Sequence, residues 1–204
     1  MDPVQIGVGP WVGPWPDDER YDPVLLAEGD RRNVVDRYRY WRLAAVVAEL
    51  DTRRHAFHVA VENWQHDLNI GSVVRSANAF NAAGVHIVGA RRFNRRGAMV
   101  TDRYLQLHHH QTFAGLQRFA ASSALTLVGV DNGPGAVPIE SFEMPPACLL
   151  VFGQEGPGLS TAAYQACDVV LSIAQYGSTR SLNAGAAAAI AMHAWICQHA
   201  IAPT

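Results

Sequence analysis

Five polar residues in three separated segments have the side chains needed to act on a polar or anionic substrate. One is a fixed cation, one is a carboxylate and three are short polar groups: Arg75, Glu155, Asn69, Ser181 and Asn183. An arginine among apolar neighbours, as Arg75 is, needs an anionic partner from the protein or from a ligand. Asn69 and Ser181 are also good helix N-caps, so capping alone could explain each of them.

The three segments, residues 63–75, 151–160 and 175–183, each follow a strand-like apolar run and precede a helix-like one. Repeated alternation of this kind predicts an α/β fold with a mostly parallel sheet covered by helices on both faces. The expected strands are 56–61, 85–89, 105–108, 125–130, 147–152 and 168–173, and the expected helices are 70–82, 113–122, 160–166 and 182–200. Ligands bind at the carboxyl ends of such strands, so we expect the three segments to converge.

The glycine-rich segment 153–158 invites a comparison with nucleotide-binding loops. Its spacing is not G-x-G-x-x-G, and a phosphate-binding P-loop needs a lysine that this chain lacks, which argues against nucleotide hydrolysis. Glycines leave the backbone unobstructed, so a flat ligand such as adenine can lie against main-chain amides. The alternative is a simple turn that opens a helix at Ser160.

Metal and disulfide chemistry are not expected. Residues 108–110 are three consecutive histidines, which point to alternate faces of a strand and cannot all bind one ion. The three cysteines are far apart in apolar segments, which favours buried, reduced thiols. No apolar run approaches the length of about 18 residues that spans a membrane, and residues 1–20 do not resemble an export signal, so we expect a cytoplasmic protein.

Charge is segregated along the chain although the net charge is only −2. Residues 1–30 hold seven acids and one arginine, whereas residues 31–103 hold 13 arginines and six acids. All 16 basic residues are arginine, which suits phosphate contact but also fits a GC-rich genome. We expect RNA contacts from the clustered arginines, with a generic solvated face as the alternative: Arg31, Arg32, Arg39, Arg42, Arg91, Arg92, Arg95 and Arg96.

The chain divides into an N-terminal extension over residues 1–54 and a second domain over residues 55–204. Residues 1–30 form an acidic arm rich in proline and glycine. We expect the aromatic residues of this arm to dock it on an apolar surface. Apolar residues at helical spacing predict an amphipathic helix over 33–50, with the arginines on its basic face.

Together the three segments resemble the signature motifs of the SpoU class of SPOUT RNA methyltransferases. The matching patterns are N-x(5)-N-I-G-x-x-x-R over 63–75, F-G-x-E-G-x-G-L-S over 152–160, and S-L-N over 181–183. The resemblance covers roughly residues 56–200. It implies transfer of a methyl group from S-adenosylmethionine to a ribose 2′-hydroxyl, a C-terminal deep trefoil knot and a homodimer.

By motif position, the resemblance assigns catalytic roles to Asn69, Arg75, Glu155, Ser181 and Asn183. It implies that the cofactor lies against residues of the knotted loops: Gly153, Gly158, Ile173 and Leu182, with Val130 at the preceding strand end. Two other classes remain as alternatives, a non-catalytic RNA-binding module that keeps the fold and a dinucleotide-dependent oxidoreductase.

The chain departs from common family forms in two places. It has no separate RNA-binding domain of the ribosomal-protein type, which favours transfer RNA over ribosomal RNA as the substrate. Ala174 and Gln175 stand where members often have proline and a hydrophobic residue, which affects the shape of the cofactor loop. Because guanidinium stays protonated in proteins, we expect Arg75 to clamp a phosphate rather than to act as the base.

Overall fold

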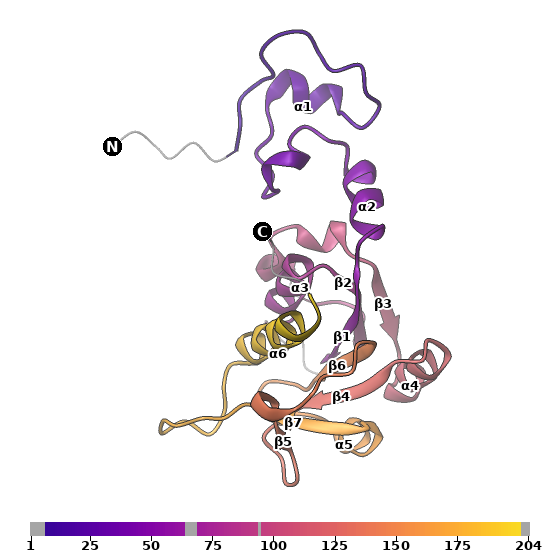
Figure 1. Cartoon of the computed structure of the whole chain (residues 1–204), viewed down its shortest axis with the longest axis vertical. Helices are drawn as coiled ribbons and strands as arrows, with labels where there is room; N and C mark the ends of the chain where they lie inside the picture. Colours follow the sequence, from indigo (N-terminus) through magenta and orange to yellow (C-terminus); the bar gives the residue numbers. More distant parts are fainter. Residues whose placement is uncertain (1–6, 64–68, 94, 201–204) are drawn as a thin grey trace. The chain divides into compact units, whose positions relative to one another are not determined.

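The computed structural model describes residues 7–63, 69–93 and 95–200, except for the side chains of Arg95 and Arg96. Within it the chain forms two compact units, Met1–Arg53 and Arg54–Thr204, which are described separately (Figure 1). No helix among the described residues is long and apolar enough to cross a membrane.

The larger unit is built on a seven-stranded sheet in which every neighbouring pair is parallel. The strand order is β3-β2-β1-β6-β4-β7-β5. The strands are β1 His55–Asn63, β2 Ala82–Gly89, β3 Leu107–His110, β4 Thr126–Val130, β5 Val137–Pro138, β6 Cys148–Phe152 and β7 Val169–Ser172. The predicted parallel α/β fold is confirmed. The short β5 was not expected, and the strand predicted at 105–108 lies two residues later.

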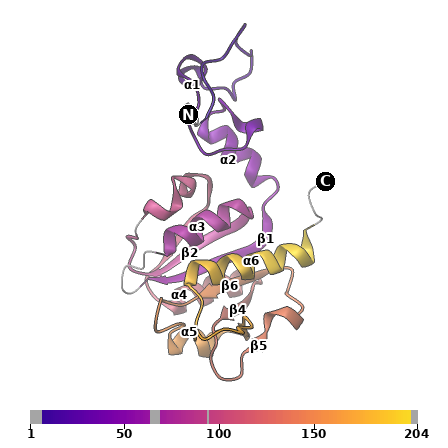
Figure 2. The same cartoon turned by 90° about the vertical axis from the view of Figure 1, so that its left-hand side faces the viewer.

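Helices cover both faces of this sheet, as predicted, because the strand side chains alternate between two apolar clusters. The helices are α3 Ile70–Ala79, α4 Phe113–Ser122, α5 Thr161–Ala166 and α6 Ala184–His199. Helices α3 and α6 pack with Val59 and Val61 of β1 on one face. Helices α4 and α5 pack with Ala60, between those two valines, on the other (Figure 2). The trefoil knot stays a prediction.

Three 3-10 helices complete the described connections of the larger unit: η2 Arg95–Ala98, η3 Thr101–Tyr104 and η4 Ile139–Ser141. The first two fall within residues 90–104, between β2 and β3. Both lie against α3, the helix that carries the first motif.

In the N-terminal unit the predicted helix over 33–50 is wrong. The structure has α1 Pro23–Glu28, the 3-10 helix η1 Asp36–Tyr38, and α2 Leu43–Asp51. Between η1 and α2, Tyr40 has a positive φ of 64°, which interrupts any helix. The buried Asp30 carboxylate accepts a hydrogen bond from the Tyr40 amide at 2.9 Å and pairs with Arg32 at 2.7 Å. These contacts outweigh the helical pattern of the sequence, so no continuous basic helix exists.

The acidic arm folds back within its own unit. Val8 and Asp30 exchange two backbone hydrogen bonds of 2.9 Å. Trp11 lies edge-on to Tyr40 with ring centroids 5.3 Å apart, and Tyr21 lies edge-on to Trp41 at 6.5 Å. The expected docking of the arm through its aromatic residues is therefore present between the two halves of this unit.

Candidate functional site

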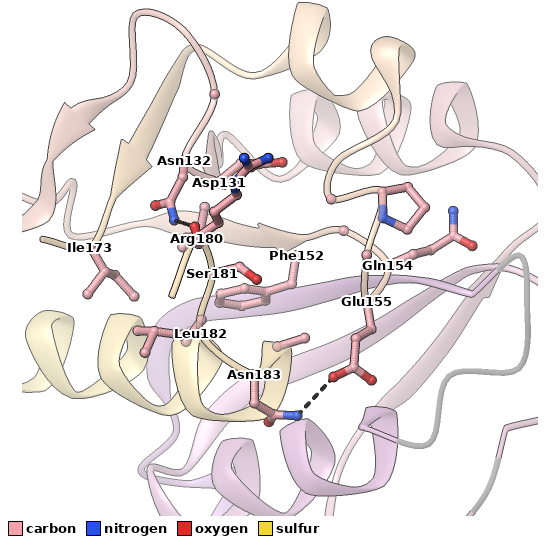
Figure 3. A pocket seen from close by; sticks show the side chains of 18 of the residues that line it. Asp131, Asn132, Phe152, Gln154, Glu155, Ile173, Arg180, Ser181, Leu182 and Asn183 are labelled. Atoms are coloured by element: carbon pink, nitrogen blue, oxygen red, sulfur yellow. Dashed lines mark hydrogen bonds between the residues drawn. The ribbon is translucent and has the colours of Figure 1, made fainter. Parts of the chain in front are cut away.

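A pocket of about 650 Å³ lies where three loops leave the carboxyl ends of β4, β6 and β7 (Figure 3). The loop after β6 carries the second motif, and the loop after β7 carries the third. All five residues expected to contact a cofactor line this pocket: Val130, Gly153, Gly158, Ile173 and Leu182. Segments 151–160 and 175–183 therefore converge here, as parallel strand order predicts, whereas no described residue of segment 63–75 lines the pocket. Of the first motif, residues 64–68 lie outside the described residues.

One residue from each motif meets in a hydrogen-bonded trio beside the pocket. The Asn69 amide donates to the Glu155 carboxylate at 2.5 Å. The Asn183 amide donates to the Asn69 side-chain oxygen at 2.9 Å and to Glu155 at 3.2 Å. Figure 3 shows Glu155 and Asn183 turned toward each other across the pocket edge. The trio ties α3, the loop after β6 and the start of α6 into one unit.

Capping, the alternative explanation for Asn69 and Ser181, does not account for either residue. Helix α6 begins at Ala184, and its N-cap is Asn183, whose side-chain oxygen accepts from the Gly185 and Ala186 amides at 3.0 and 3.2 Å. Ser181 is exposed and lines the pocket. Asn69 occupies the N-cap position of α3 but makes no capping hydrogen bond, because its side chain is bonded to the trio.

Arg75 stands apart from the pocket wall. It lies on α3 and is exposed, and it makes no hydrogen bond or ion pair with the described residues. The arginine that the sequence marks as needing an anionic partner therefore has none within this part of the chain. Its guanidinium is open to a ligand.

The loop after β6 depends on its glycines. Gln154 and Gly158 exchange two backbone hydrogen bonds of 3.0 Å, which close the loop on itself. A Cβ atom on Gly153 would lie 2.0 Å from the Gly158 carbonyl carbon, so only glycine fits at 153. Gly156 and Gly158 have positive φ angles of 92° and 74°. The alternative of a turn that opens helix α5 is also present, since Ser160 caps that helix.

Two carboxylates that the sequence analysis missed hold this loop in place. Glu62, fully buried in β1, accepts hydrogen bonds from the Ser160 amide and hydroxyl, both at 2.7 Å. Asp131, just after β4, accepts from the Leu159 amide at 2.7 Å. The sequence signal that could have identified Glu62 is its position within the apolar run of β1, because a buried carboxylate requires hydrogen-bond partners.

The pocket also contains an unpaired acceptor. The side-chain oxygen of Gln175 is buried and has no hydrogen-bond partner among the described residues. Gln175 occupies the position where a hydrophobic residue was expected, and it lines the pocket. A buried acceptor without a donor is costly, so a ligand that donates a hydrogen bond there would be favoured. Together with the apolar side chains of Val130, Ile173 and Leu182, it makes the pocket fit a nucleoside-like ligand.

Residues 56–193 match the model of the SpoU rRNA Methylase family. The chain belongs to this family. A Mycobacterium ulcerans protein named as an uncharacterized tRNA/rRNA methyltransferase is 33% identical over 157 residues, which cover 72% of this chain and 48% of that protein. A relative of the same name from Mycolicibacterium smegmatis is 32% identical over 67% of this chain and 45% of its own length. The chain spans about half the length of these curated relatives.

Solved SpoU structures have the same fold. The SpoU methyltransferase AviRb from Streptomyces viridochromogenes is 27% identical with a TM-score of 0.63, covering 72% of this chain and 60% of that one. AviRb has also been solved in complex with the cofactor AdoMet. The A. aeolicus TrmH/SpoU tRNA modifying enzyme, at 19% identity and a TM-score of 0.68, covers 77% of this chain and 82% of its own, and shows the shared fold.

The arginines expected to contact RNA differ in what they do within this SpoU family member. Arg32 pairs with buried Asp30, and Arg39 donates to the Arg32 carbonyl at 2.7 Å. Arg42 donates to the Tyr21 carbonyl at 2.9 Å. Arg31 is exposed and makes no hydrogen bond or ion pair with the described residues.

Two further arginines of the predicted set lie after β2. Arg91 and Arg92 are exposed, on a segment that the buried Asn63 amide holds through the Ala90 and Arg92 carbonyls at 2.6 and 3.0 Å. Asn63 opens the first motif, so the motif also positions this basic segment. The side chains of Arg95 and Arg96 lie outside the described residues.

Four histidines form a row beneath α4, on the opposite side of the sheet from α3. His86 bonds His58 at 3.0 Å through one ring nitrogen and His110 at 2.9 Å through the other, and it stacks on His108. Burial lowers the pKa of His86 to about 2 and that of His58 to about 4. His109 faces the other way and bonds the Gly89 carbonyl, as alternation predicts. Among the described residues, no group of three or more His, Cys, Asp or Glu is placed to hold a metal ion.

The three cysteines are free. Burial raises the pKa of Cys148 and of Cys167 to about 12, so both are unreactive thiols at neutral pH. Cys197 is exposed, which contradicts the expectation that all three are buried. It lies in the last turn of α6, where an apolar sequence faces solvent.

Proposed function

We propose that this chain is an S-adenosylmethionine-dependent RNA methyltransferase that modifies a ribose 2′-hydroxyl. The observation that carries the proposal is the trio of Asn69, Glu155 and Asn183, which joins all three family motifs at the edge of the pocket. The AdoMet complex of AviRb supports the choice of cofactor. Transfer RNA is the first substrate class to test and ribosomal RNA the second, since both appear in the names of the mycobacterial relatives.

The pocket suits S-adenosylmethionine in its shape and its donors and acceptors. Val130, Ile173 and Leu182 would hold the adenosine against apolar side chains, beside the loop that the close packing of Gly153 on Gly158 shapes. The Gln175 oxygen would accept a hydrogen bond from the base. When bound, the cofactor supplies a methyl group on a sulfonium, whose departure leaves a neutral thioether. Positioning the ribose and removing its hydroxyl proton are therefore the tasks left to the protein.

Arg75 is proposed to clamp the phosphate that adjoins the target ribose and to stabilise the developing alkoxide. Its exposure and its lack of a partner among the described residues support this role, because the guanidinium is then available to an anion. A guanidinium remains protonated, so the hydroxyl proton passes to phosphate or water. The methylated nucleotide then leaves with the new O–CH₃ bond formed and the S–CH₃ bond broken.

The trio is proposed to position the catalytic elements rather than to touch the substrate. Asn69 does not bond Arg75; it fixes the first turn of α3, the helix that carries Arg75, against Glu155 and Asn183. Both polar groups of Asn183 are engaged, one in the trio and one in the cap of α6. Ser181 is the remaining motif side chain with an open hydroxyl, and we assign it to the ribose edge.

RNA backbone contacts are proposed for the arginines that remain exposed, Arg31, Arg91 and Arg92, and for Arg95 and Arg96 as a prediction from the sequence. We also propose that the chain acts as a cytoplasmic homodimer. Half-exposed Ile190 on α6 and exposed Met99 and Val100 offer apolar contacts to a second copy. A solution mass of one chain would contradict the dimer.

Isothermal titration with S-adenosylmethionine and with NAD separates the competing classes. A methyltransferase binds the first and not the second, and an oxidoreductase does the reverse. A non-catalytic RNA-binding module binds RNA but neither small molecule. Gly153→Ala should abolish S-adenosylmethionine binding, because its Cβ has no room. Gly9→Ala is the control, because its Cβ meets no atom within 4 Å and Gly9 does not line the pocket.

A further inference from the structure

Three charged residues line the described part of the pocket: Asp131, Glu155 and Arg180. Glu155 accepts hydrogen bonds from two asparagine amides, and Asp131 accepts one from the Leu159 amide. Arg180 differs from both. Its carbonyl is held by the Asn132 amide at 3.3 Å, but its guanidinium makes no hydrogen bond or ion pair with the described residues. The backbone of Arg180 is thus held by a hydrogen bond, and its guanidinium is available to a ligand in the pocket.

The charges of the pocket are opposite to those of S-adenosylmethionine. The cofactor carries a sulfonium, an α-ammonium and an α-carboxylate, which are two cations and one anion. The pocket offers two carboxylates and one guanidinium. Matched charges of this kind favour one orientation of a ligand over others. We propose that Arg180 binds the α-carboxylate of S-adenosylmethionine and so fixes the methionine end of the cofactor. This inference rests on the proposed function.

The arrangement of the third loop supports that role. Arg180 and Leu182 are two residues apart on the loop that leads into α6, and both line the pocket. The Asn132 amide bonds the Arg180 carbonyl, and Figure 3 shows Glu155 on the other side of the view from Ile173. One loop therefore supplies an apolar contact for the adenosine and a cation for the amino-acid end. Because guanidinium matches carboxylate with paired donors, it also sets orientation.

An RNA phosphate is the competing anion for Arg180. The pocket position favours the cofactor, because exposed arginines that do not line the pocket, such as Arg75 and Arg91, are open to the RNA backbone. Arg180 is the one arginine among the described residues that line the pocket.

The test measures binding of two ligands that differ only in the carboxylate: S-adenosylmethionine and its decarboxylated analogue. The wild-type chain should prefer S-adenosylmethionine by about tenfold, the effect of one charge-assisted contact in a solvated site. Arg180→Gln should remove that preference by weakening S-adenosylmethionine alone. Arg180→Lys should restore part of it. Arg118→Gln removes an exposed arginine on α4 that has no partner in the described part of the chain, so it should leave both affinities unchanged.

Each contrary outcome has a distinct meaning. If wild type binds S-adenosylmethionine and Arg180→Gln binds it equally well, the inference is overturned while the proposed function stands. Equal weakening of both ligands also overturns it, because the carboxylate is then not the partner. Unchanged cofactor affinity with weaker RNA binding assigns Arg180 to phosphate instead. A wild-type chain that binds neither ligand overturns the proposed function itself.

Discussion

Most arginines of the N-terminal unit bond to the protein itself, whereas two arginines of the larger unit do not. In residues 7–53, Arg32 neutralises a buried carboxylate, Arg39 bonds backbone carbonyls, and Arg20 stacks on Trp41 with its guanidinium 4.4 Å from the ring centroid. In the larger unit, Arg75 and Arg180 have no partner among the described residues. The first group holds a small unit together. The second is open to anions.

The difference shows that the density of arginines along the chain does not locate a binding surface. In the arginine-rich segment 31–42, Arg32 pairs with Asp30 and Arg39 bonds a backbone carbonyl, so these guanidinium groups are already engaged. The segment also lacks the continuous basic helix that the sequence predicted. The isolated arginine of the first motif keeps its full charge available. Burial and pairing, rather than count, decide which cations can bind RNA.

The largest effect should come from Arg75→Ala. Removing a cation that acts only on the developing charge should lower the rate of methyl transfer by about 10²- to 10³-fold. Single-turnover methylation measures the rate, and titration should show unchanged S-adenosylmethionine affinity. Arg20→Ala is the matched control with an unchanged rate. Normal turnover by Arg75→Ala would remove the distinction between the two groups of arginines.

Arg32→Ala should instead weaken folding. It leaves the fully buried Asp30 carboxylate without its ion pair, which should lower the free energy of unfolding by about 2–3 kcal/mol. Denaturant unfolding of the full chain measures the loss. Despite the effect of burial, hydrogen bonds from Arg32 and Tyr40 hold the pKa of Asp30 below its ordinary 3.8. Its stabilisation is therefore present above pH 3.8 and is lost as pH falls further, so the variant and wild type should converge in acid.

The same contrast between satisfied and open groups extends to the histidines beneath α4. His86 and His58 stay neutral in the fold, whereas both bind protons near pH 6.5 when unfolded. Stability should be full above pH 6.5 and fall with decreasing pH toward about 4, by about 1.4 kcal/mol per pH unit for each group. His86→Leu should flatten this profile, and His109→Leu, on the other side of β3, should not. Parallel pH profiles for wild type and His86→Leu would refute this account of the row.

The smallest effect should come from Arg91→Ala. Loss of one phosphate contact should weaken RNA binding a few-fold and reduce the slope of log affinity against log salt by about 0.7 to 0.9. Arg42→Ala, whose guanidinium bonds the Tyr21 carbonyl, should change the slope less. RNA binding that does not respond to salt would contradict phosphate contact by either group.

The sequence predicted most of the larger unit because its strands and helices have clear apolar periods. Three segments at the carboxyl ends of parallel strands were predicted to meet, and hydrogen bonds join one residue from each. The start of α6 could not be predicted, because Ser181 and Asn183 are both good N-caps and only the trio selects between them. The two-residue strand β5 lacks any periodic signal.

The features that the sequence did not predict depend on contacts between residues far apart in the chain. Glu62 reaches Ser160 across 98 residues of sequence, and Asp131 reaches Leu159 across 28. No local pattern encodes such bonds. In the N-terminal unit, the Asp30 carboxylate accepts a hydrogen bond from the Tyr40 amide, ten residues away. This bond interrupts segment 33–50, which has helical periodicity. Tertiary hydrogen bonds thus override local preference in both places.

The most direct measurement follows a labelled methyl group from S-adenosylmethionine into RNA. Transfer RNA and ribosomal RNA fragments, each lacking modifications, are incubated with the chain, digested to nucleosides and analysed by mass spectrometry. We predict a single labelled 2′-O-methylnucleoside, absent with Arg75→Ala. Label on a base, or no label in either RNA from a chain that binds S-adenosylmethionine, would contradict methylation of the ribose hydroxyl.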